Sequence, residues 1–175
     1  MKREASFRYP HLTSTEQQIE GKLKEFEFMK ASETVVTPFA RLALGFSFLS
    51  AVADRFGLWG ALGAPHVAWG DFAHFITYTA TLNWFLPRPL APALAWLATG
   101  AEVTLGIALI LGVFTRTTAF LSGFLLLLFA LAMAVALGLK APLDASVFSA
   151  SAAAFLLATA ERYPFSVDSI FRRRN

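Results

Sequence analysis

The stretch "TTAFLSGFLLLLFALAMAVALGL", residues 117–139, contains no charged side chain. An α-helix of about 20 apolar residues crosses a hydrocarbon core of roughly 30 Å, so this stretch is long enough to span a membrane. Across the whole chain of 175 residues, 56% are hydrophobic and only 15% are charged, a composition unlike that of ordinary soluble domains. The sequence therefore predicts an integral membrane protein.

Three further apolar stretches extend this prediction to an all-α, four-helix membrane bundle. The expected spans are about 35–55, 89–113, 117–139 and 143–160. Short connections make the second, third and fourth spans antiparallel neighbours. Small residues at helical spacing favour close helix packing in lipid, and we expect one such stripe on the first span and one on the fourth to face neighbouring helices. These residues are Ala40, Ala43, Ser47, Ser50, Ala145, Ser149 and Ala153.

The basic residues predict the orientation of the chain. Most Lys and Arg residues lie before the first span, between the second and third, and after the fourth. By the positive-inside rule, both termini are expected in the cytoplasm of a multi-pass protein of the cytoplasmic (inner) membrane. The run Arg172 to Arg174 favours anionic lipid, and no nucleic acid is needed to explain the net charge of +3. The expected divisions are a polar leader (1–34), the bundle (35–161) and a basic tail (162–175).

Two segments outside the spans carry helical patterns. In the leader, Ile19, Leu23 and Phe26 recur at helical spacing and predict a short amphipathic helix that begins with a capping box at Ser14 and Gln17. This helix lies on the membrane face or docks a partner.

The long extracytoplasmic loop, residues 56–88, carries a second such helix. Asp71 can cap this helix, on which Phe72, Phe75, Ile76 and Thr79 share one face. The helix lies flat at the membrane interface or covers a cavity between the spans.

Glu102 is a carboxylate within the second span. A charge at such a position costs about 2.5–3.5 kcal/mol, so Glu102 should face the bundle interior, either as a helix staple or as a ligand for a proton or headgroup. Arg41 is one candidate partner. If the small stripe packs inward, Arg41 extends to the cytoplasmic interface; if the Arg41, Gly45 and Phe48 face packs inward, the two residues can pair.

A second polar cluster is expected at the outer ends of the helices. It comprises Asp54, Arg55, His74, Lys140 and Asp144, with His66 and Arg88 nearby. Because two spans begin on this side, their helix dipoles favour an anion there. The cluster is either a binding site for a small anion or a solvated rim in which Asp144 merely caps the fourth span.

The chain has no cysteine. This excludes thiol–disulfide exchange, cysteine-ligated iron–sulfur clusters and covalent haem attachment. The three histidines lie outside the predicted spans, and no metal-ligand spacing is present. We therefore expect no haem, iron–sulfur or metal site, and any redox chemistry needs a diffusible carrier or a partner.

Several of these residues resemble the pattern of the DoxX/DoxD family. They are Arg41, Gly45, Phe48, Glu102, Gly106, Gly112, Thr115 and Arg116. The stretches "RLALGFSFLSAVADRFGLWG" and "ALGLKAPLDASVFSASAAAFLLA" resemble its DoxD-type branch, and the resemblance covers residues 38–160. It implies a four-span bundle and, in the archaeal branch, the membrane subunit of a thiosulfate:quinone oxidoreductase that works with a separate small subunit.

Two functions follow as expectations. The first is a quinone-linked oxidoreductase subunit acting on thiosulfate or a similar small anion, with Glu102 and Arg41 as catalytic residues, the outer cluster as substrate site and quinone as cofactor. The alternative is a non-enzymatic accessory or scaffold subunit on a larger respiratory or photosynthetic membrane complex. The expected partners are membrane lipid, a partner protein subunit and further copies of the chain. Transport is less favoured, because four short spans leave little room for a solute path.

Overall fold

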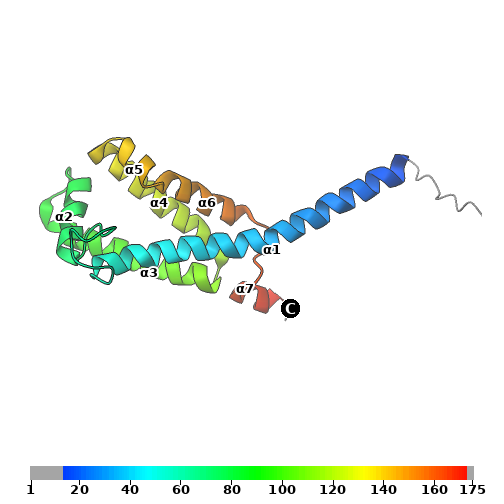
Figure 1. The fold of residues 1–175 in the computed structure, drawn as a ribbon, viewed down its shortest axis with the longest axis horizontal. Helices are drawn as coiled ribbons and strands as arrows, with labels where there is room; N and C mark the ends of the chain where they lie inside the picture. The colour runs from blue at the N-terminus through cyan, green and yellow to red at the C-terminus, as the bar shows by residue number, and fades with distance from the viewer. Residues whose placement is uncertain (1–13, 173–175) are drawn as a thin grey trace, which may run out of the picture.

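The computed structural model describes residues 14–172, and this part of the chain contains helices and no strands. Three helical stretches, Glu33–Arg55, Arg88–Leu111 and Thr115–Leu137, are long and apolar enough to cross a membrane, and a shorter apolar helix follows them. The expected helical membrane protein is therefore confirmed (Figure 1). The elements are α1 (Ser14–Arg55), α2 (Phe72–Leu82), the 3-10 turn η1 (Arg88–Leu90), α3 (Ala91–Leu111), α4 (Thr115–Leu137), α5 (Lys140–Asp144), α6 (Val147–Thr159) and α7 (Val167–Arg172).

Helix α1 joins the leader to the first span. It begins at Ser14, where the leader helix was expected to begin, but it continues to Arg55 as one helix of 42 residues. No glycine or proline lies between Gly21 and Pro38, so nothing in the sequence ends the helix there. In Figure 1 the N-terminal part of α1 projects beyond the bundle. The side chains of the expected capping box, Ser14 and Gln17, lie outside the described part of the structure.

The fourth apolar segment is broken. Residues 143–160 were expected to form one continuous span, but α5 ends at Asp144 and α6 starts at Val147. Between them Ser146 adopts a left-handed conformation with φ of 55°, which an α-helix cannot contain. Helix α6 has 13 residues and is about 20 Å long. It is therefore shorter than a regular membrane span.

The helices pack in two main pairs, α1 with α3 and α4 with α6. In Figure 1 these pairs lie close together near the middle of α1 and diverge towards α2 and α5. The hydrophobic core sits where the four helices converge. It is formed by Leu44, Phe48, Leu109, Ala119, Ala154, Leu157 and Tyr163.

The buried face of α1 is the one that carries Arg41, Leu44 and Phe48. The expected inward packing of the small stripe is wrong for α1, because Ala43, Ser47 and Ser50 are exposed. On the fourth segment Ala145 and Ser149 are likewise exposed, and the buried residues of α6 are Ser151, Ala154 and Leu157.

Two glycines explain this choice of face. A Cβ at Gly45 would lie 2.8 Å from the carbonyl oxygen of Gly106, and a Cβ at Gly106 would lie 3.1 Å from the carbonyl oxygen of Gly45. The backbones of α1 and α3 thus touch at a point where only glycine leaves enough room.

Candidate functional site

Glu102 and Arg55 form an ion pair inside the bundle. Nη2 of Arg55 donates to Oε1 of Glu102 at 2.7 Å, and Nη1 donates to the hydroxyl of Thr99 at 2.9 Å. Thr99 and Glu102 are three residues apart on α3 and therefore share one face. The two charged side chains are only 3% and 2% exposed. The last residue of α1 is thereby tied to the middle of α3.

Aromatic side chains cover this pair. The guanidinium carbon of Arg55 lies 3.7 Å from the ring centroid of Phe75 and 5.2 Å from that of Trp69, distances at which a cation is attracted to an aromatic face. Phe75 belongs to α2, whose predicted N-cap is confirmed: the Asp71 carboxylate accepts the backbone N–H of His74 at 2.8 Å. Helix α2 therefore covers the ion pair.

Asp54 holds the loop that leads to α2. Its carboxylate accepts backbone N–H groups from Ala68 at 2.8 Å, Trp69 at 3.3 Å and Gly70 at 3.4 Å. Asp54 is buried, and it positions the same loop segment that places Trp69 over Arg55. Two adjacent residues at the end of α1 therefore fix α3 and the loop together.

Two buried atoms of the ion pair have no hydrogen-bond partner among the described residues. They are Nε of Arg55 and Oε2 of Glu102. A buried unpartnered donor and acceptor cost free energy, and such atoms commonly mark a bound water or a functional group. They are the polar atoms that a small ligand could contact if it reached the pair.

Arg41 does not pair with Glu102, and it is buried within the protein. Its side chain is 2% exposed, and its guanidinium donates to backbone carbonyl oxygens on two segments of the chain. The last carbonyls of a helix lack partners within the helix and favour a cation. Arg41 thus caps α3 and joins it to the segment after α6. The acceptors are Leu109, Ile110 and Pro164, each at 3.0 Å, and Phe165 at 3.2 Å.

Asp168 fixes the C-terminal segment to the turn that connects α3 with α4. Its carboxylate accepts the N–H of Phe114 at 2.9 Å, and the N–H and hydroxyl of Thr115 at 2.7 and 2.8 Å. Its own N–H donates to the carbonyl of Gly112 at 3.1 Å. Asp168 therefore occupies the N-terminus of α4, a contact that the sequence analysis missed because no local pattern links residues this far apart.

The remaining predicted site residues contact charged neighbours three or four positions away in the chain. Nδ1 of exposed His74 lies 2.9 Å from the carboxylate of exposed Asp71, and exposed Lys140 pairs with exposed Asp144. Each charge of the expected outer cluster thus contacts a neighbour within the chain, and among the described residues no ion pair joins the Lys140–Asp144 pair to His74 or Arg55. Among these residues there is also no group of three metal-ligating side chains.

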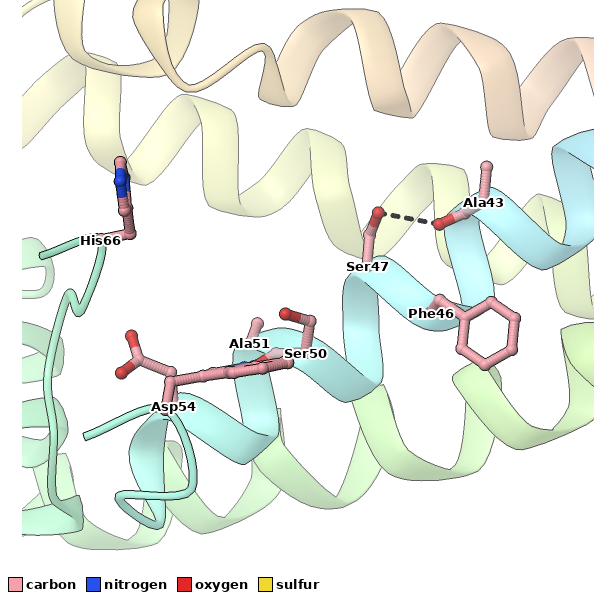
Figure 2. Close-up of a pocket in the computed structure, with 8 residues that line it drawn as sticks. Ala43, Phe46, Ser47, Ser50, Ala51, Asp54 and His66 are labelled. Atoms are coloured by element: carbon pink, nitrogen blue, oxygen red, sulfur yellow. Dashed lines mark hydrogen bonds between the residues drawn. The ribbon is translucent and has the colours of Figure 1, made fainter.

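Two cavities stand out among the described residues, and neither is lined by Glu102 or Arg41. The first is an open groove of about 530 Å³ along the exposed small stripe of α1. Figure 2 shows the Ser47 hydroxyl hydrogen-bonded to the carbonyl of Ala43 along this groove, with His66 of the loop at the end where Asp54 lies. The second, of about 1170 Å³, lies at the other end of the bundle.

The structure contains three long apolar helices, and an ion pair is buried between them. These features define a helical, multi-pass membrane protein. The DoxX family model matches residues 36–138, and the chain belongs to the DoxX family. The match runs from the first membrane stretch of α1 to the end of α4, and it confirms the family resemblance. No curated protein and no solved structure matches the chain.

Proposed function

We propose that this chain is a membrane-embedded accessory subunit that assembles with a larger membrane complex and does not itself react with a substrate. One observation carries the proposal: the charged residues expected to form a site all contact other parts of the same chain. Arg55 holds Glu102, Asp54 holds the loop, and Arg41 holds the ends of two segments. Through these contacts the charged side chains position the helices and the loop relative to one another.

The proposed topology has four crossings, with α5 and α6 together completing the fourth. Both termini then lie on the cytoplasmic side of a cytoplasmic (inner) membrane, as the distribution of basic residues predicts. Because the chain lacks cysteine, single cysteines at Gln18 and Ala61 can be labelled without background. An impermeant reagent should label Ala61→Cys in intact cells and Gln18→Cys only after lysis. The reverse pattern would invert the topology.

The proposed docking element is the projecting part of α1. Ile19 and Leu23 are exposed there, one helical turn apart, and apolar residues at this spacing are typical of a helix that packs on a partner.

The test compares two double variants in protein extracted from native membranes. Ile19→Ser/Leu23→Ser should reduce the mass of the extracted assembly towards that of the 19.1 kDa chain. The control Gln18→Ser/Lys22→Ser changes exposed polar residues of the same turns and should keep the assembly. Equal assembly in both variants would remove the docking role of this helix.

A second candidate function is a quinone-linked oxidoreductase subunit, and the unpartnered atoms at the ion pair favour it. Quinone reduction takes up protons as well as electrons, so it uses an acid near a ring carbonyl. If α2 moves aside, Glu102 protonated at Oε2 could donate to that carbonyl, with Arg55 rather than Arg41 as its partner. Thiosulfate or a similar anion would deliver electrons through a partner subunit.

Binding of a quinone analogue separates the two candidates. Under the first proposal, the purified chain binds the analogue no better than an unrelated membrane protein, and thiosulfate does not reduce a quinone in its presence. Under the second, Glu102→Gln changes the affinity or its pH dependence, whereas Glu33→Gln, which alters a carboxylate outside the ion pair, does not. Unchanged binding at every pH would exclude Glu102 as a quinone ligand.

A further inference from the structure

The larger cavity, here called the boundary cavity, lies where α1 leaves the bundle. Its volume is about 1170 Å³, and three parts of the chain form its walls. These are α1 at Glu33 and Thr34, the α3–α4 turn at residues 113–117, and the C-terminal segment from Arg162 to Ser169. No residue of the ion pair or of α2 takes part in it.

The position of the spans places this cavity at a membrane surface. The membrane-spanning stretches of α1 and α4 begin at Glu33 and Thr115, and both residues line the cavity. Immediately beyond Glu33, Val35 and Val36 are exposed apolar residues on α1. The cavity therefore lies at the depth of the lipid headgroups, between the hydrocarbon core and water.

Two arginines give the cavity its available positive charge. Arg116 and Arg162 line it and are exposed. Arg116 makes one long hydrogen bond, from Nη2 to the carbonyl of Ala160 at 3.3 Å, which places its guanidinium beside the segment that carries Arg162. A guanidinium has five N–H donors, so most of those on Arg116 remain available. Among the described residues neither arginine forms an ion pair with an acid.

The two acids of the cavity already have partners. Asp168 accepts three hydrogen bonds from Phe114 and Thr115, and Glu33 accepts the N–H of Glu161 at 3.4 Å. They therefore do not neutralise the arginines by direct contact. An anion with several oxygens can bind both guanidinium groups, because guanidinium matches phosphate geometry.

Apolar side chains form the rest of the wall. Val113, Phe114 and Val167 line the cavity, and the side chain of Phe114 is 76% exposed. A free anion would gain nothing from these groups, whereas the acyl chain of a lipid would bury them. We propose that the boundary cavity binds one anionic phospholipid, with its phosphate group on Arg116 and Arg162 and an acyl chain against Phe114 and Val167.

The experiment measures lipid retention by native mass spectrometry of the full chain released from vesicles of equal phosphatidylglycerol and phosphatidylcholine. The wild-type chain should retain phosphatidylglycerol preferentially. Arg116→Gln/Arg162→Gln should reduce this preference about tenfold or more, because each basic residue removed takes away an attraction to anionic lipid of about 1 kcal/mol. The matched control Arg88→Gln/Lys140→Gln removes the same charge from exposed residues at the opposite end and should keep the preference.

Three outcomes would overturn the proposal. An unchanged preference in Arg116→Gln/Arg162→Gln would show that the arginines bind no phosphate. An equal loss in the control variant would show that only net charge matters. Displacement of the lipid by inorganic phosphate alone would reassign the cavity to a free anion. The proposal does not depend on the accessory function, because the double variant leaves the exposed face of Ile19 and Leu23 intact.

Discussion

The guanidinium of Arg55 lies 2.7 Å from the carboxylate of Glu102, beneath the ring of Phe75. Three elements meet at this contact: the end of α1, the middle of α3 and the helix α2. Burying two charges costs desolvation free energy that roughly offsets their attraction. The pair therefore determines which elements meet more than it raises the total stability of the bundle.

Removal of one charge of this pair should destabilise the protein more than removal of both. Glu102→Ala leaves the buried charge of Arg55 unpaired and should lower the free energy of unfolding by about 3–5 kcal/mol. Arg55→Leu/Glu102→Leu should lower it much less, because no isolated charge remains. Unfolding in mixed detergent micelles measures both values. A double variant less stable than Glu102→Ala would show that the pair itself contributes net stability.

The contact between Gly45 and Gly106 should tolerate no added methyl group. In Gly45→Ala, the new Cβ would lie 2.6 Å from a side-chain carbon of Ile110 and 2.8 Å from the carbonyl oxygen of Gly106. Such overpacking costs about 1–3 kcal/mol. In the control Gly100→Ala, no heavy atom beyond the adjoining backbone of the same helix lies within 4 Å of the new Cβ. This variant should be stabilised by about 0.5–1 kcal/mol, since alanine favours a helix. Thermal unfolding of both variants in detergent tests the contrast.

Arg41 should hold the C-terminal segment on the end of α3. Arg41→Met keeps an apolar stem and removes four hydrogen bonds to carbonyl groups, so we expect a loss of at least about 3 kcal/mol. Amide hydrogen exchange should increase in α7, whose start Arg41 positions through Pro164 and Phe165. Arg88→Met, at an exposed position, should leave this exchange unchanged. Normal protection of α7 in Arg41→Met would mean that Asp168 alone fixes the segment.

Low pH should loosen the N-terminus of α2. The backbone N–H of His74, and to a lesser degree its side chain, hold the pKa of Asp71 below the ordinary aspartate value. Because the pKa is lowered in the folded state, the stabilisation is fully present above about pH 4. It is lost as the pH falls through the lowered pKa. NMR titration of the Asp71 carboxyl group and the α2 amides measures this.

The matched variant for this titration is Asp71→Asn, which keeps a capping oxygen but carries no titrating group. It should abolish the pH dependence of the α2 amides, while Asp144→Asn on α5 should leave it unchanged. If the α2 amides respond to acid equally in the wild type, Asp71→Asn and Asp144→Asn, then another titrating group causes the pH dependence.

Local patterns in the sequence were sufficient for the first three apolar spans, for α2 and for the inward position of Glu102, but not for the break at Ser146 in the fourth segment. Long apolar stretches predict spans because the membrane leaves no other partner for backbone groups. Asp71 followed by an apolar face predicts α2, since capping acts within one turn. The cost of a charge in lipid predicts that Glu102 is buried, as observed.

The sequence by itself determined properties that depend on one segment alone, namely the first three apolar spans and the cap of α2. The tertiary structure alone decided which face of α1 packs, that Glu102 meets Arg55 and not Arg41, and that Arg41 and Asp168 join the two ends of the α3–α4 turn to the C-terminal segment. The physical reason is that these contacts join residues 47 to 124 positions apart in the chain. Which residues become partners depends on how closely two helix backbones approach. At Gly45 and Gly106 the close approach is possible because neither residue has a side chain. A pattern of hydrophobic residues does not reveal this.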